Sequence, residues 1–168
     1  MPFETPFSAV PGLFDATITS FQHEIGGAAP STIIRTDQTW HIHLSWRTIG
    51  LATGMIGGTW HVHAYLESVG PGPDISVVDP ADHFIPLTPG VSPVNYNIVM
   101  DVPANVVGLA PGNNMNTTGL YKLVVALTYV DLTGAPGPMA AFDEGPTLHF
   151  SIHKPCSYTR HPLVLAPA

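Results

Sequence analysis

The segment TWHIHLSW, residues 39–46, and its near-repeat TWHVHAYL, residues 59–66, decide the fold that this sequence predicts. Apolar side chains occupy every second position in both segments. They are Trp40, Ile42, Leu44 and Trp46 in the first and Trp60, Val62, Ala64 and Leu66 in the second. Because side chains alternate between the two faces of a β-strand, a period of two indicates strands buried on one side. We therefore expect strands over 39–48 and 59–68, each with an apolar inner face and a histidine-bearing outer face.

The rest of the chain follows the same period, and no segment has helical periodicity of useful length. Residues 13–24 alternate, and further strands are expected near 74–79, 94–102, 119–131 and 146–153. Gly and Pro punctuate the chain between these segments, as turns do. We expect 69–74 and 132–139 to be loops, because each proline removes a backbone donor, and Asp143–Gly145 to be a turn. The sequence thus predicts an all-β sandwich of about seven to nine strands.

One strand carries a resemblance to known sandwiches. In TGLYKLVVALTYVD, residues 118–131, alternate positions read Gly119, Tyr121, Leu123 and Val125. This pattern resembles the penultimate strand of immunoglobulin-like and fibronectin-like antiparallel β-sandwiches, where the Tyr forms a corner. The resemblance implies that residues 146–154 form the last strand, with Leu148, Phe150 and Ile152 inward. It implies a fold and no activity.

The composition limits the class of protein. A chain of 168 residues suits one domain, which we divide into an N-terminal arm (1–12), a sandwich (13–154) and a C-terminal arm (155–168). Charged residues make up 10%, against roughly 25% in a typical soluble domain. Five basic residues face twelve acidic ones without any basic cluster, so a nucleic-acid partner is not expected. A single cysteine, Cys156, excludes an internal disulfide framework.

The sequence contains no evident targeting or membrane segment. The N-terminal stretch MPFETPFSAVPGLF lacks the basic start and long apolar run of a signal peptide. No apolar run approaches the ~20 residues of a membrane helix. We therefore expect no membrane span and a cytoplasmic location by default, with signal-independent export or assembly at a surface left open.

The paired histidines suggest a metal site. His41 and His43 share one strand face, and so do His61 and His63. If the two strands formed one hairpin, opposite side chains ~5 Å apart would bring four imidazoles onto one transition metal, zinc or copper. In the immunoglobulin-like order, however, these strands belong to opposite sheets. The alternatives are thus a metal-binding protein or metal-dependent enzyme, and half-exposed histidines on a charge-poor surface.

The function we favour is self-assembly by a non-catalytic protein, with no catalytic residue or cofactor site assigned. With Tyr121 inward, its strand turns an uncharged row outward after Lys122, and the immunoglobulin-like order flanks that row with histidines of both neighbouring strands. The apolar, proline-bearing termini could dock on a neighbouring copy, giving a homo-oligomer or larger assembly. A third alternative is a small-ligand or glycan-binding module using the loop 105–118. The expected interface residues are Val124, Ala126, Thr128, His61, His63, His149 and His153.

Overall fold

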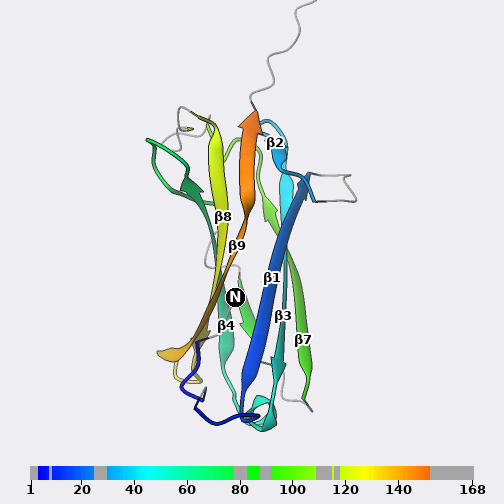
Figure 1. Cartoon of the computed structure of the whole chain (residues 1–168), viewed down its shortest axis with the longest axis vertical. Helices are drawn as coiled ribbons and strands as arrows, with labels where there is room; N and C mark the ends of the chain where they lie inside the picture. Colours follow the sequence, from blue (N-terminus) through cyan, green and yellow to red (C-terminus); the bar gives the residue numbers. More distant parts are fainter. Residues whose placement is uncertain are drawn as a thin grey trace, which may run out of the picture.

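The computed structural model describes residues 4–7, 9–24, 30–77, 83–87, 92–108, 115 and 118–151. Within these residues nine strands and one short 3-10 helix follow one another, so the secondary structure is all-β, as predicted (Figure 1). The elements are β1 (Asp15–Glu24), β2 (Ile33–Arg35), β3 (Trp40–Ile49), η1 (Leu51–Gly54), β4 (Thr59–Ser68), β5 (Ile75–Ser76), β6 (Phe84–Pro86), β7 (Val94–Val102), β8 (Leu120–Val130) and β9 (Pro136–Ser151).

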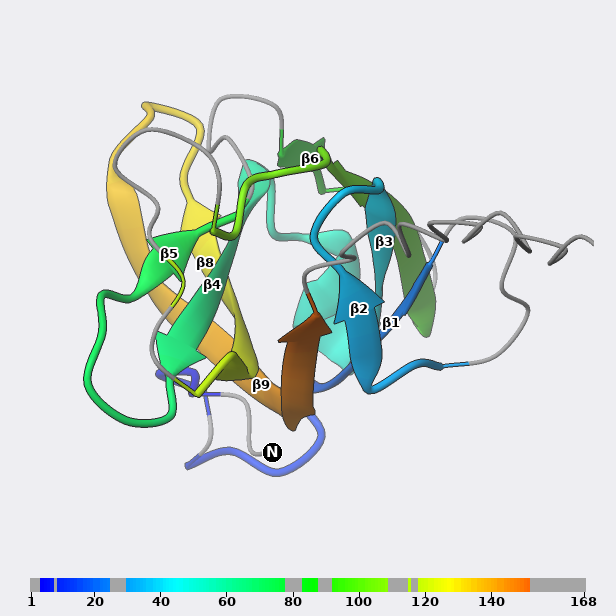
Figure 2. The same ribbon diagram turned by 90° about the horizontal axis from the view of Figure 1, so that it is seen from above.

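The strands form two sheets that face each other (Figure 2). One sheet has three strands in the order β1-β3-β7, and the other has six, in the order β2-β9-β8-β4-β5 with β6 also pairing with β4. The pairings are antiparallel except that of β2 with β9, which is parallel. The predicted β-sandwich is confirmed.

The two Trp-His-x-His strands, β3 and β4, belong to different sheets. Gly50 directly follows β3 and has a φ of 120°. A Cβ at this position would lie 2.4 Å from the carbonyl oxygen of Leu13. The same carbonyl accepts a hydrogen bond of 2.9 Å from the N–H of Ala52 in η1. The chain is therefore held against the start of β1 as it crosses between the sheets, and β3 and β4 do not form a hairpin.

The core lies between the two sheets and consists of the predicted alternating side chains. Trp40 and Trp60 are almost fully buried, one from each sheet. Trp40 packs edge-on against Phe150 at a centroid distance of 5.8 Å, and Tyr121 meets the same ring at 5.7 Å. The other predicted core residues that the structure describes are also buried: Ile42, Leu44, Val62, Leu123 and Val125.

Strand β9 starts earlier than the sequence predicted. Instead of a loop over 132–139, a tight turn follows β8, and β9 begins at Pro136. Proline is tolerated at the start of a strand or beside an irregularity. Both conditions hold here, because Pro136 is the first residue of β9 and the pairing with β8 shifts register between Thr128 and Val130. The predicted loop over 69–74 is confirmed as irregular chain.

A β-bulge interrupts β9 at the predicted turn Asp143–Gly145, which is strand instead. Thr147 lies opposite Lys122 and Glu144 opposite Val124, so β9 has one more residue than β8 between these pairs. An extra residue reverses which side chains face the core. Phe150 and Leu148 are buried beyond the bulge, whereas Ala141 and Met139 are buried before it.

Three contacts cover the outer edge of β9. Glu4, in the N-terminal arm, exchanges two backbone hydrogen bonds with Ala140, of 2.8 and 3.0 Å. The carboxylate of Asp143 accepts hydrogen bonds from the backbone N–H (2.6 Å) and hydroxyl (2.7 Å) of Ser20 in β1. Strand β2 pairs with the last residues of β9. Covered edges limit uncontrolled strand pairing with other chains. The Glu4–Ala140 pairing also shows that part of the N-terminal arm packs on its own domain.

Some predicted features lie outside the described residues. They include Ile152 of the predicted core, Cys156 and the C-terminal arm. Among the residues that are described, no helix is long and apolar enough to cross a membrane.

Candidate functional site on the outer face of the six-stranded sheet

The outer face of the six-stranded sheet gathers the histidines of β4 beside the uncharged row of β8. His61 lies opposite Thr128, His63 opposite Ala126, and Tyr65 opposite Val124. Since the strands alternate inward and outward, these side chains share the outer face. The structure therefore brings together five of the seven expected interface residues.

The rings on this face form a continuous column along β4. Phe84 of β6 stacks on His61, with centroids 4.1 Å apart and planes 13° apart. His61 and His63 approach to 3.9 Å between centroids, and His63 is roughly parallel to Tyr65 at 6.0 Å. One ring nitrogen of each histidine also takes part in a 3.1 Å hydrogen bond, between Nε2 of His63 and Nδ1 of His61.

His63 favours the neutral state. Partial burial of His63 lowers its pKa below the ordinary 6.5, and the neighbouring His61 lowers it further. Burial acts because the charged imidazolium loses hydration, and His61 acts because two like charges would repel at this distance. At neutral pH His63 thus offers an aromatic ring and hydrogen-bonding nitrogens without charge.

Strand β9 completes the face with an aromatic residue that the sequence analysis did not assign. Phe142 lies opposite Ala126, with Ala140 opposite Thr128. The bulge causes this placement, because simple alternation back from Phe150 would have turned Phe142 toward the core. The register shift at the bulge turns Phe142 outward, and the DEG sequence at 143–145 does not indicate that a bulge lies there.

We expected His149 and His153 to flank the outer row of β8, and this prediction is wrong for His149. That residue lies opposite Leu120, the first residue of β8, whereas Ala126 lies in the middle of the strand. The reason is the early start of β9, which places residues 140–144 beside the uncharged row. His153 lies outside the described residues.

We call this surface the aromatic face and define it by eight residues: Phe84, His61, His63, Tyr65, Val124, Ala126, Thr128 and Phe142. Its three large rings remain well exposed, with 46% for Phe84, 41% for Phe142 and 38% for Tyr65. A hollow of about 230 Å³ adjoins Tyr65 and Val124 at one end. There Lys122 pairs with Glu144, so charge at this end is partly neutralised.

The other histidine pair occupies the outer face of the three-stranded sheet. Nδ1 of His41 lies 2.6 Å from the carboxylate of Asp101 on β7. His43 stacks on Phe21 of β1, with centroids 4.6 Å apart and an interplanar angle of 6°. The core separates this pair from the one on β4, so the four imidazoles do not meet on one ion. Within the described part of the chain, no group of three or more His, Cys, Asp or Glu is placed to hold a metal.

Comparisons with known proteins do not assign a family. No family model matches the chain, and no curated protein matches it. One similar solved structure is the X-ray structure of Northeast Structural Genomics Consortium target SoR45, with 10% sequence identity and a TM-score of 0.37. The superposed region covers 91% of this chain and 93% of the chain of the solved structure. A similarity at this level carries no conclusion about function.

Proposed function

We propose that this protein is a non-catalytic interaction protein that self-associates through the aromatic face. The observation that carries the proposal is the column of four rings, from Phe84 to Tyr65, beside an uncharged row on β8. Aromatic residues are enriched, and charged residues depleted, at the centres of protein interfaces. An exposed cluster of this kind marks a contact surface more often than a bare solvent face.

A second copy of the chain is the partner that this face suits best. The eight residues of the face include no acidic, Lys or Arg side chain. At one end Lys122 is joined to Glu144, and Glu67 and Asp74 line the hollow. A strongly charged partner would therefore find little to neutralise across most of the face. A copy of the same face supplies matching rings and hydrogen-bonding imidazoles. In a two-fold contact the same surface serves both subunits. We therefore favour a homo-oligomer.

We also propose that the sandwich is of the immunoglobulin-like kind. The crossing from β3 to β4 between sheets and the buried Tyr121 on the penultimate strand support this assignment. Two features depart from a simple antiparallel sandwich, namely the parallel pairing of β2 and the bulge in β9. The fold adds no activity to the proposal.

Metal binding is the alternative proposal, and it would now need ligands from a second copy. His61 and His63 provide two nitrogens close together, whereas a structural zinc site takes four ligands. Two facing copies would double the number of imidazoles. Addition of zinc should then raise both the mass of the particle and the unfolding temperature, because a ligand of the native assembly stabilises it.

Light scattering coupled to size-exclusion chromatography tests the main proposal. The full chain, treated with a chelator, should elute above its monomer mass at pH 7.5, and the average mass should fall toward the monomer at pH 5.5. Acid should weaken the contact because protonation of His63 would carry charge into it. A monomer at pH 7.5 at every practical concentration would overturn the proposal.

A further inference from the structure

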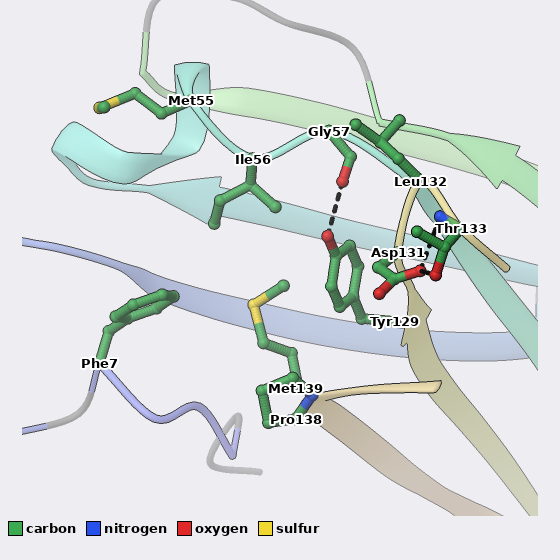
Figure 3. A pocket seen from close by; sticks show the side chains of 10 residues that line it. All are labelled: Phe7, Met55, Ile56, Gly57, Tyr129, Asp131, Leu132, Thr133, Pro138 and Met139. Carbon is green, nitrogen blue, oxygen red and sulfur yellow. Dashed lines mark hydrogen bonds between the residues drawn. The ribbon is translucent and has the colours of Figure 1, made fainter. Parts of the chain in front are cut away.

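A second feature lies at the end of the sandwich, where η1, the β8–β9 turn and the N-terminal arm meet (Figure 3). They enclose a pocket of about 350 Å³ that opens to solvent. Its wall is mostly apolar and comes from segments far apart in the sequence: Phe7, Met55, Ile56, Leu132, Pro138 and Met139. A pocket of this size falls at the lower end of the range for small-molecule sites.

The position of Tyr129 makes the pocket preformed. Its hydroxyl donates a 2.6 Å hydrogen bond to the carbonyl of Gly57 (Figure 3). A Cβ at Gly137 would lie 2.2 Å from the ring, and one at Gly58 would lie 2.9 Å from it. The ring is thus fixed between two glycines by a hydrogen bond, and a ligand would not have to order it. Preorganisation of this kind reduces the cost of binding.

Two large apolar side chains at the mouth remain almost fully exposed. Met55 is 86% exposed and Leu132 is 84% exposed, and they come from two different segments, Met55 directly after η1 and Leu132 from the β8–β9 turn. Side chains with so little burial contribute little to folding. A bound apolar body would remove part of their surface from water.

Among the lining residues that the structure describes, Asp131 is the one with a formal charge. One carboxylate oxygen, Oδ1, accepts hydrogen bonds from the hydroxyl and N–H of Thr133 and from the N–H of Ala135. The Thr133 hydroxyl first, and then these backbone donors, lower the pKa of Asp131, so it stays ionised at neutral pH. In Figure 3 the other oxygen is turned away from Thr133, toward the side of the Tyr129 ring. Asp131 also raises the pKa of Tyr129 after the larger effect of burial.

We propose that this pocket binds a small compound with an aromatic or aliphatic body and one ammonium group. The apolar wall would cover the body, and the carboxylate of Asp131 beside the Tyr129 ring would receive the cation. A cavity of about 150 Å³ is enough for benzene, so this pocket has room for a ring system with a short chain. The chain itself has five basic residues, which makes a cation from another copy a weaker candidate.

Three probes with one indole body and different head groups test the charge preference by calorimetry of the full chain at pH 7.5. Tryptamine should bind more tightly than indole-3-ethanol, and indole-3-acetate should bind least. Asp131→Asn keeps an oxygen acceptor for the turn but removes the charge. It should weaken tryptamine about three- to fivefold and leave indole-3-ethanol unchanged.

Substitutions of Met55 and Leu132 at the mouth of the pocket (the rim), with a matched control elsewhere, test where the probes bind. Met55→Ala and Leu132→Ala should weaken all three probes, whereas Leu51→Ala should not, since Leu51 is 81% exposed but does not line the pocket. The thermal unfolding midpoint of each variant verifies its fold. The proposal is overturned if no probe binds at millimolar concentration, or if tryptamine and indole-3-ethanol bind alike. It is also overturned if the rim variants lower the oligomeric mass without affecting any probe, because the rim would then be a contact between copies.

Discussion

The two Trp-His-x-His strands share a local sequence but lie in contrasting surroundings. On β3, His41 meets the carboxylate of Asp101 and His43 stacks on Phe21. On β4, the two histidines contact each other and extend into a column with Phe84 and Tyr65. The motif sets which way each side chain points, and the neighbouring strands decide what the histidines do.

The neighbouring rows differ in chemistry. Beside the outer row of β3, β7 presents Asn95, Asn97 and Asp101, and the hydroxyl of Ser45 donates a 2.7 Å hydrogen bond to Asn97. Beside the outer row of β4, β8 presents mainly apolar side chains and β9 adds Phe142. The outer face of the three-stranded sheet therefore mixes hydrogen-bonded polar side chains with the exposed Phe21 (41%) and Val99 (54%), whereas the aromatic face gathers its exposed rings beside a mainly apolar row.

The inner halves of the two motifs should be equivalent. Trp40→Ala and Trp60→Ala each remove a buried indole and leave a cavity, so each should lower the free energy of unfolding by about 3–5 kcal/mol. Chemical denaturation measures both. A near-zero change for either variant would contradict the core assignment, and a large inequality would show that the two strands are not packed alike.

The bulge in β9 distinguishes the two faces, and Asp143 tests its inner side. Asp143→Ala removes the acceptor of two hydrogen bonds from Ser20 and should cost about 1.5–3 kcal/mol, the range for hydrogen bonds to a charged group. Glu144→Ala is the matched control. It loses only a surface ion pair and should cost about 1 kcal/mol or less. Equal costs would contradict the inward position of Asp143.

Much of the sandwich could be predicted from the period of two. Wherever a long strand alternated without interruption, as in β3, β4 and β8, both the strand and its buried face were predicted. The period of two turned His61 and His63 outward, and the strand order implied by the immunoglobulin-like resemblance placed them beside the outer row of β8, where they lie opposite Thr128 and Ala126.

The features that could not be predicted depend on contacts between distant residues. Strands β2 and β6 have three residues each, too few to establish a period. Phe142 was missed because the expected last strand began only at residue 146, whereas β9 begins at Pro136. Nothing local to the sequence marks the bulge that turns Phe142 outward. The pocket combines Phe7, Met55 and Met139 from three segments, so it exists only once the chain has folded.

The smallest expected stability effect is the acid sensitivity of His63. Because burial and His61 lower the pKa of His63 in the folded protein, the unfolded chain binds more protons below its own pKa of 6.5. The free energy of unfolding should therefore have its full value above pH 6.5. It should decrease as the pH falls from 6.5 toward the lowered pKa of His63 in the folded protein. His63→Gln removes this titration, so its unfolding midpoint should decrease less between pH 7.5 and pH 5.5 than that of the wild type. Parallel decreases would contradict the assignment.

Sedimentation velocity of two charge-insertion variants tests the central claim most directly. Val124→Glu puts a carboxylate on the aromatic face, and Thr17→Glu puts one at an exposed position on the outer face of the three-stranded sheet. We expect Thr17→Glu to sediment as the wild-type oligomer at pH 7.5, and Val124→Glu to shift to the monomer while still unfolding in one cooperative transition. Loss of the oligomer in Thr17→Glu, with its retention in Val124→Glu, would contradict the claim and assign the contact to the other sheet.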